Sequence, residues 1–291
     1  MEKTIDLHVH SLFSDGKKNI SEMIQIARDN NVGYLSFTEH YNMSAYNVAK
    51  KIAPSDIEII PGIEVGTDIT SLGLTGKNHK CHILVYYPST KICIMLDKYE
   101  ENREVAIRKI LELLNKKENV KVSYSQVAKY ARNSNHITRF DVAITLAKLG
   151  LSQDPITAYG EYLDFNSKCY VSRHKETPTN LIRYVKKVGG VTVLAHPKSM
   201  SLSIENEYSF IKMLVNAGLD GIEVYNPHND DIRRTRYLGY CNEFELIPTV
   251  GSDYHGLPSR PEEIGKGINN NLNITDITII ERIKKRAGVK Y

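Results

Sequence analysis

Short apolar runs that end in polar residues recur along the chain, and their spacing predicts an α/β fold. Most of these runs are rich in Ile, Val, Leu and Tyr, a composition typical of buried parallel strands. The runs cover residues 4–7, 34–37, 57–60, 82–87, 191–195, 221–225 and 246–250. Seven strands over this length fit either a barrel or a doubly wound sheet.

Helical patterns lie between several of these runs. Asn19 and Glu22 stand at the spacing of a capping box, which predicts a helix over residues 22–29. A second helix is expected over residues 179–187, because Pro178 precedes it and Gly189 follows it. Strands that alternate with helices indicate βαβ units and a parallel sheet.

The stretch from residue 94 to residue 172 breaks this alternation. It contains four helical patterns, over residues 96–117, 125–132, 139–149 and 155–163, and no convincing long strand. We therefore predict a main domain made of residues 1–93 and 173–291. Residues 94–172 are expected to form a helical insertion that covers its functional site.

Composition and charge narrow the function classes. The chain has 291 residues, 41% hydrophobic and 25% charged, with a net charge of +4 spread along its length. This pattern argues against a duplex-DNA-binding arm and a polybasic membrane segment. No run approaches the roughly 18 apolar residues of a membrane span. The first strand begins without an apolar signal core, so the cytoplasm is the expected compartment.

The cysteines and histidines point to different chemistry. Cys81, Cys93, Cys169 and Cys241 form no Cys-x-x-Cys pair, which argues against a thiolate zinc site and a disulfide framework. The histidines instead gather, together with carboxylates, near the ends of the predicted strands. These groups are His8, His10, Asp15, His40, Glu64, His82, His196, Asp253 and His255.

Their placement predicts a metal site. His8 and His10 should share one face of a strand, because strand side chains alternate with period two. In a parallel α/β fold, ligands bind beyond the carboxyl ends of the strands. His82 fits less naturally because it opens its run, and His79 is the alternative three residues earlier. Imidazole with carboxylate suits Zn, Fe or Mn and disfavours an all-oxygen Ca or Mg site.

In their order, these motifs resemble those of the PHP (polymerase and histidinol phosphatase) family. The motifs are Asp6-Leu7-His8-Val9-His10, Ser14-Asp15-Gly16, Thr38-Glu39-His40, Gly62-Ile63-Glu64, Ala195-His196-Pro197 and Gly251-Ser252-Asp253-Tyr254-His255. The resemblance extends from residue 4 to about residue 256. The insertion and the segment Asn135-His136-Ile137-Thr138-Arg139 resemble the family's branch of nucleotide phosphatases and 5′-to-3′ exoribonucleases.

The resemblance implies a distorted seven-stranded (β/α) barrel with two to three divalent metal ions. His8, His10 and Asp253 would hold the first ion, and Glu64 would bridge it to a second, which His82 and His196 complete. Asp15, His40 and His255 would hold the third. Glu39 stands where many relatives have Asp, but the implied ligand there is His40.

The implied chemistry is phosphate ester hydrolysis. Three divalent ions against three carboxylates would leave a charge of about +3, which attracts a phosphate. A metal-bound hydroxide would attack phosphorus, and either a metal-bound water or a nearby histidine such as His196 or His255 could protonate the leaving oxygen. Arg139, Arg173 and His136 are candidate phosphate contacts, because arginine binds phosphate bidentately. The alternative interpretation of each arginine is a surface residue on a helix.

Three functions remain open at this point. The first is hydrolysis of phosphate esters of nucleotides or short oligonucleotides. The second is a phosphatase for a small metabolite such as histidinol phosphate, which the helical insertion disfavours. The third is a non-catalytic module like the PHP domains of bacterial replicative polymerases. All nine implied ligand positions are filled in this chain, so the sequence favours an enzyme.

Overall fold

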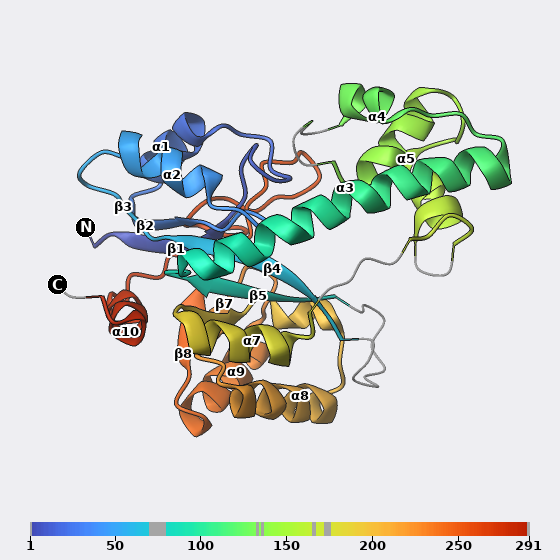
Figure 1. The fold of residues 1–291 in the computed structure, drawn as a ribbon. Coiled ribbons are helices and arrows are strands. Elements are labelled where there is room, and N and C mark those ends of the chain that lie inside the picture. The colour runs from blue at the N-terminus through green and yellow to red at the C-terminus, as the bar shows by residue number, and fades with distance from the viewer. Residues whose placement is uncertain are drawn as a thin grey trace. The chain divides into compact units, whose positions relative to one another are not determined.

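The fold is described here from a computed structural model, which describes residues 2–69, 80–131, 134, 137–164, 167–171 and 176–289. The chain divides into two compact units (Figure 1). The first unit consists of Met1–Ser11, Gly16–Ile94 and Lys175–Tyr291, and the second of Leu12–Asp15 and Met95–His174. The first unit carries the strands. Whether the second unit covers a functional site stays a prediction.

The described strands of the first unit form two sheets. The smaller sheet is parallel and has the order β1-β2-β3, with β1 Thr4–Val9, β2 Val32–Phe37 and β3 Glu58–Ile59. The larger has the order β4-β5-β6-β7-β8, with β4 Gly62–Asp68, β5 Lys80–Tyr86, β6 Val191–Leu194, β7 Gly221–Tyr225 and β8 Ile247–Val250. The predicted α/β fold is confirmed.

Strand β4 and the direction of β5 were not predicted. Gly62 and Gly66 interrupt the apolar pattern of β4, and glycine is a poor strand former. Strand β5 is antiparallel to both of its neighbours, whereas β6, β7 and β8 run parallel. The expectation of a parallel strand is therefore wrong for β5. An apolar run indicates burial, but it does not indicate strand direction.

Single contacts join the two sheets. Isolated parallel bridges pair Val9 with Tyr254 and His40 with Glu64, and the Tyr86 hydroxyl donates to the Leu7 carbonyl at 2.9 Å. One hydrophobic core cluster includes residues from both sheets. The described strands are therefore arranged around a common core, but their pairing forms two sheets, and a closed seven-stranded barrel is not confirmed.

Helices pack around these sheets in the first unit. They are α1 Ile20–Asp29, α2 Ser44–Ile52, α7 Pro178–Val188, α8 Ile204–Ala217, α9 Asp231–Glu243, α10 Thr278–Ala287 and the 3₁₀ turn η3 Pro197–Met200. The predicted capping box is confirmed, because Asn19 Oδ1 accepts from the Glu22 amide at 3.0 Å and Glu22 Oε2 accepts from the Asn19 amide at 2.9 Å. Helix α7 ends at Gly189, as predicted.

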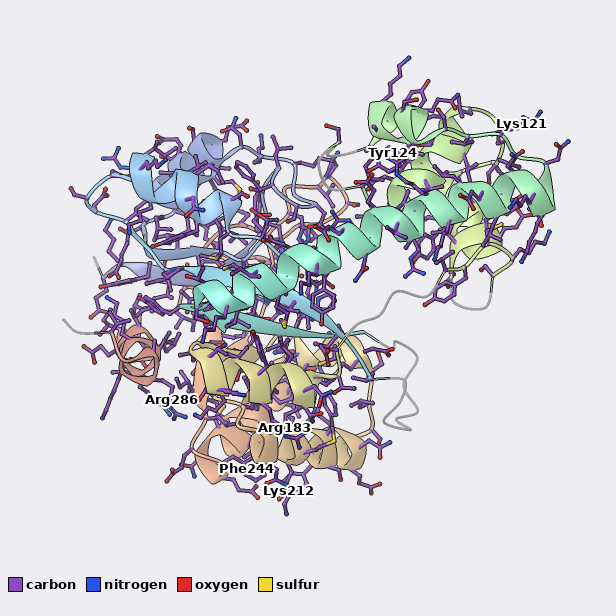
Figure 2. The ribbon with its side chains drawn as sticks, in the orientation of Figure 1. Lys121, Tyr124, Arg183, Lys212, Phe244 and Arg286 are labelled. Atoms are coloured by element: carbon purple, nitrogen blue, oxygen red, sulfur yellow. The ribbon has the colours of Figure 1, made fainter. Side chains whose placement is uncertain are left out.

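Helix α10 seals one side of the shared core. Its Ile279, Ile280 and Ile283 are at most 1% exposed and pack in the cluster with residues of β1 and β8. Burial of each isoleucine stabilises the folded state by about 1.5–3 kcal/mol. At its C-terminal end lies Arg286, which is labelled in Figure 2 and whose Nη1 donates to Asp220 Oδ1 at 2.8 Å. The helix is therefore anchored by apolar packing along its length and by an ion pair at its end.

The second unit consists largely of helices with an apolar core of their own. Its elements are α3 Thr90–Glu118, which begins in the first unit, α4 Tyr124–Tyr130, α5 Arg139–Lys148, α6 Pro155–Ala158 and the π-helical turn η2 Tyr159–Leu163. These match the four predicted helical patterns to within a few residues, apart from the earlier start of α3. Side chains such as Ile110, Leu114, Val142 and Leu146 are fully buried in its core.

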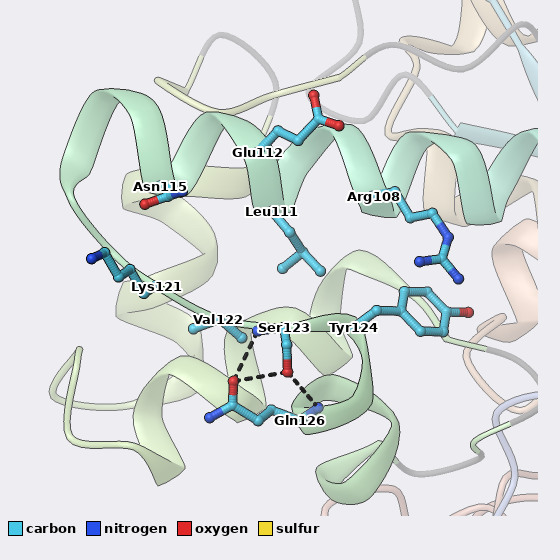
Figure 3. A pocket seen from close by; sticks show the side chains of 9 residues that line it. All are labelled: Arg108, Leu111, Glu112, Asn115, Lys121, Val122, Ser123, Tyr124 and Gln126. Carbon is cyan, nitrogen blue, oxygen red and sulfur yellow. Dashed lines mark hydrogen bonds between the residues drawn. The ribbon is translucent and has the colours of Figure 1, made fainter.

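A cavity of about 560 Å³ opens between α3 and the start of α4 in the second unit (Figure 3). The Arg108 guanidinium lies 4.2 Å from the centre of the Tyr124 ring and also donates to Glu104 Oε1 at 2.7 Å. Glu112 is the one carboxylate among the nine described residues that line it. This lining lacks a metal-ligand set.

Within the described part of the chain, no helix combines the length and apolar character needed to cross a membrane.

Candidate metal centre

Glu64 is buried at the centre of a group of histidine imidazoles in the first unit. It is the third residue of β4, and its side chain is 1% exposed. Five histidine nitrogens lie within 3.4 Å of its carboxylate. They are His82 Nδ1 at 2.8 Å, His196 Nε2 at 3.0 Å, His10 Nε2 and His40 Nδ1 at 3.2 Å, and His8 Nε2 at 3.4 Å. Five predicted ligands thus surround a sixth predicted ligand, which is Glu64.

His8 and His10 come from the end of β1, and their rings point the same way, as the period-two argument predicts. The two Nε2 atoms are 3.2 Å apart, and Asp253 Oδ1 lies 3.4 Å from each. Both histidines are fully buried. Three potential ligand atoms thus converge on one point, which is the arrangement that a divalent cation requires.

The antiparallel direction of β5 explains why His82 reaches this group from the start of a strand. Ile83 pairs with Leu194 at the end of β6, and the Ala195 amide donates to the His82 carbonyl at 3.1 Å. The start of β5 therefore lies beside the carboxyl end of β6. Burial lowers the pKa of His82 to about 4, so its ring is neutral near pH 7 and can act as a ligand. His79 lies outside the described residues.

His196 and Asp253 are held in uncommon backbone conformations. His196 lies two residues after the end of β6 and has φ of 25°, and Asp253 follows β8 with φ of 55°. Left-handed backbone at a residue with a side chain costs on the order of 1–3 kcal/mol and is found where surrounding contacts enforce it. Here these conformations accompany side chains that face Glu64 and the pair of β1 histidines.

Charge sets the ionisation of these groups. Burial alone would raise the pKa of Glu64, but the surrounding imidazoles of His82, His8 and His40 hold it well below its usual range. Burial likewise opposes protonation of His8, yet the carboxylates of Glu223 and Glu64 raise its pKa well above the usual value. The Glu64 carboxylate is therefore ionised, which is the form that binds a cation.

The donor set fits divalent metal ions. Triplets of donors whose ligand atoms all lie within 4.8 Å of one another include His8-Glu64-His196, His8-His10-Asp253 and His10-His40-Glu64. His255 is also near, because its Nδ1 lies 3.7 Å from Asp253 Oδ1. Asp15 belongs to the second unit. The assignment of each ligand to a particular ion stays a prediction.

Two contact residues of this cluster were missed by the sequence reasoning. Glu223, in the middle of β7, is fully buried and its Oε1 lies 2.8 Å from His8 Nδ1. The signal was present, since a carboxylate inside the apolar run 221–225 is rare unless it is paired. Arg260 Nη2 donates to Asp253 Oδ2 at 2.7 Å, and its Nη1 lies 2.7 Å from His255 Nδ1. No sequence pattern marked Arg260.

A third buried carboxylate ties β1 to distant parts of the first unit. Asp6 Oδ1 accepts from the Ser252 amide at 2.9 Å and from the His8 amide at 3.3 Å, and Asp6 Oδ2 accepts from the Gly265 amide at 2.8 Å. Burial raises the pKa of Asp6 to about 6, although these hydrogen bonds lower it. Asp6 thus holds the backbone of His8 and of Ser252, the residue before Asp253.

The predicted phosphate contacts lie elsewhere. Arg139 belongs to the second unit, where its guanidinium lies 4.9 Å from the centre of the Tyr170 ring and Nη1 donates to the Leu163 carbonyl at 3.2 Å. Arg173 and His136 lie outside the described residues. Their role in binding phosphate stays a prediction.

Comparison with known proteins relates the chain to one family. Residues 6–173 match the family model of the PHP domain. The 5′-3′ exoribonuclease of Haemophilus influenzae is 26% identical over 283 residues, which cover 96% of this chain and 98% of that protein. The 3′,5′-nucleoside bisphosphate phosphatase of Chromobacterium violaceum is 23% identical over 277 residues, covering 94% of this chain and 93% of that protein.

A solved structure shares the fold over nearly the same length. The crystal structure of a Bifidobacterium adolescentis protein aligns with a TM-score of 0.74 and 23% sequence identity, covering 98% of this chain and 96% of that one.

Proposed function

The chain belongs to the PHP domain family, and from this premise we propose that it hydrolyses phosphate esters of nucleotides or short oligonucleotides with two to three divalent metal ions, Zn, Fe or Mn. It is a metal-dependent phosphoesterase. The observation that carries the proposal is the buried Glu64 carboxylate with five imidazole nitrogens within 3.4 Å. A nucleotide substrate is supported by two relatives, one named as a 5′-3′ exoribonuclease and the other as a 3′,5′-nucleoside bisphosphate phosphatase.

In this proposal, His8, His10 and Asp253 would hold the first ion, and Glu64 would be shared with a second ion, which His82 and His196 would complete. His40, His255 and Asp15 would hold the third. When bound, the ions polarise the phosphoryl oxygens and supply a water molecule that is nucleophilic at neutral pH. The chain's own contribution is to hold these donors close together, with the Glu64 carboxylate ionised and the His82 ring neutral.

Glu64, His196 and His255 are the proposed catalytic residues. Glu64 would be shared between ions, because its two oxygens face different histidines. His196 and His255 are the candidates for giving a proton to the leaving oxygen. His196 Nδ1 lies 2.9 Å from Ser199 Oγ, and His255 Nδ1 lies 2.8 Å from the Asp253 carbonyl, so both rings are oriented by a local partner.

Arg139, Arg173 and His136 are the proposed contacts to the substrate phosphate. Arginine would bind a phosphate bidentately, and a charge-assisted contact of this kind is worth about 1.5–3 kcal/mol. For Arg139 the proposal requires that its guanidinium remain accessible beside Tyr170.

A substrate panel tests the proposal. Phosphate release or chain shortening is measured on 3′,5′-nucleoside bisphosphates, 5′-phosphorylated oligoribonucleotides, sugar phosphates and histidinol phosphate. We expect kcat/KM for a nucleotide substrate to exceed that for histidinol phosphate by at least about tenfold, since phosphate and base contacts both contribute to transition-state binding. The Glu64→Gln protein, purified in the same way, controls for contaminating phosphatases.

The alternatives give different outcomes. Preference for histidinol phosphate would assign the chain to small-metabolite phosphatases. Protein that binds metal but turns over none of the substrates would be a non-catalytic module.

A further inference from the structure

Glu223 contacts two of the metal-ligand candidates. It lies in β7, with no exposed surface, and both of its oxygens are used. Oε1 lies 2.8 Å from His8 Nδ1, and Oε2 accepts from the His196 amide at 2.7 Å and from Asn226 Nδ2 at 3.2 Å. One carboxylate thus contacts a histidine of β1 and a histidine that follows β6.

The contact with His8 determines which ring nitrogen is available. A carboxylate only accepts hydrogen bonds, so His8 must carry its proton on Nδ1. In the neutral ring, Nε2 then presents a lone pair, and Nε2 is the atom that faces Glu64 and Asp253 at 3.4 Å. Metal-bound histidines are generally oriented in this way by a carboxylate on the other nitrogen.

The contact with His196 acts on the backbone instead of the ring. His196 has φ of 25°, a conformation that residues with side chains rarely adopt. The short bond from its amide to Glu223 Oε2 holds this conformation, which directs the His196 ring so that Nε2 lies 3.0 Å from Glu64 Oε1. Losing the acceptor would leave a buried amide without its partner.

The space for this carboxylate is provided by Gly251. A Cβ atom at this position would overlap both Glu223 Oε1 and the Cβ of His8. Gly251 therefore allows β8 to approach closely enough for Glu223 and His8 to remain in contact, and a side chain here would push the two apart.

We propose that Glu223 is a positioning residue that sets the metal affinity of the cluster. By fixing the His8 tautomer and the His196 backbone together, it prepares ligands of both the first and the second proposed ion. The inference rests on the proposed metal site. It predicts that a single change at Glu223 weakens two sites at once, although Glu223 itself is not among the ligands.

Glu207 provides a matched control within the same unit. It is also buried, at 4% exposed, and accepts from Arg236 Nε at 2.9 Å and from the Tyr237 hydroxyl at 2.8 Å. These partners lie on α9, and none is a metal-ligand candidate. Glu223→Gln and Glu207→Gln make the same chemical change at buried carboxylates, so general destabilisation affects both.

The test measures Zn²⁺ affinity by competition with a chromogenic chelator in the full-length protein. In Glu223→Gln, the amide NH₂ must face either a ring N–H or a backbone N–H, so His8 is driven toward the tautomer with its proton on Nε2. We expect Zn²⁺ binding to weaken by about 10- to 100-fold, the usual range for such outer contacts, and by less than about twofold in Glu207→Gln. Equal affinities in the two variants would overturn the proposal.

Two further measurements keep the test decisive. Imidazole ¹H–¹⁵N spectra of the Zn²⁺-loaded wild type should show His8 protonated at Nδ1, and protonation at Nε2 would overturn the proposal. If Glu223→Gln does not fold, Gly251→Ala replaces it, with a metal-affinity loss of at least about threefold expected and unchanged affinity contradicting the assignment. A wild-type protein that binds no Zn²⁺, Fe²⁺ or Mn²⁺ would instead contradict the proposed function.

Discussion

The first unit contains a buried cluster of histidines and carboxylates, whereas the second is dominated by an apolar core. In the first unit, His8, His10 and Glu64 are buried and contact one another inside the fold. In the second unit, the core cluster is built from apolar side chains, and pairs such as Arg108 with Glu104 lie on the surface. An exposed pair of this kind contributes at most about 1 kcal/mol, whereas a buried polar group without a partner costs about 1–3 kcal/mol.

This difference indicates where each unit tolerates change. The first unit must keep every partner of its buried groups, so a substitution there affects several residues together. The second unit is stabilised mainly by apolar packing, so its polar surface can change without altering the fold. Substitutions in the first unit are therefore expected to reduce catalytic activity strongly, and substitutions in the second unit are expected to reduce it less.

Removal of the metal ions should have the largest effect. Protein purified without chelator should contain two to three transition-metal ions per chain, as the donor set suggests. Dialysis against a chelator should reduce turnover by at least about a thousandfold, since bound ions supply several kcal/mol of transition-state stabilisation. Far-ultraviolet circular dichroism should change little. Metal-free protein with full activity would contradict the metal assignment.

The Glu64→Gln substitution should have the second largest effect on activity. The change preserves the volume of the side chain but removes the charge that five imidazoles face, so we expect kcat/KM to fall by at least about a hundredfold. The same change at Glu118 of the second unit, which accepts from Lys168 Nζ at 3.0 Å, should alter kcat/KM by less than twofold. Similar losses in the two variants would remove the contrast between the units.

Arg139→Ala tests whether the second unit contributes to substrate binding. If Arg139 contacts phosphate, kcat/KM on a nucleotide should fall by about ten- to a hundredfold while metal content stays constant. Turnover of p-nitrophenyl phosphate should fall less. Arg173→Ala should behave in the same way. An unchanged nucleotide kcat/KM, together with a lower melting temperature, would assign Arg139 to packing against Tyr170.

Leu146→Ala should have the smallest effect on activity. Leu146 is fully buried in the core of the second unit, and truncation of such a leucine costs about 2–5 kcal/mol of the free energy of unfolding. Because Leu146 packs in an apolar core and is not a candidate metal ligand, kcat of the folded protein should change by less than twofold. Denaturant unfolding and steady-state kinetics at a permissive temperature measure the two quantities.

Much of the fold could be predicted because local signals determine it. The Asn19 capping box and the Pro178 and Gly189 signals marked two helices, and period-two alternation placed His8 and His10 on one face. Glu64 was predicted as a ligand after a strand end, and it lies within β4 beside the predicted histidines. Residue type and approximate position were sufficient there, because several donors converge on the same edge.

The remaining features depend on pairing between distant segments. The antiparallel direction of β5, which brings His82 to the end of β6, is set by contacts with β4 and β6 and leaves no trace in its own apolar run. Arg260 contacts Asp253 from a loop without regular structure. Glu223 could have been found, since it interrupts an apolar strand, but only its contact with His8 explains why it is there.

The hydrogen bonds of Asp6 have a consequence for biosynthesis. Its partners Ser252 and Gly265 lie 246 and 259 positions further along the chain. At a synthesis rate of roughly 5–20 residues per second, about 12–50 seconds separate the appearance of Asp6 from that of Ser252. Throughout this interval His8 and His10 are already made but lack Asp253. The proposed ligand set is therefore complete only late in translation, which favours metal binding by the finished protein over metal binding by the nascent chain.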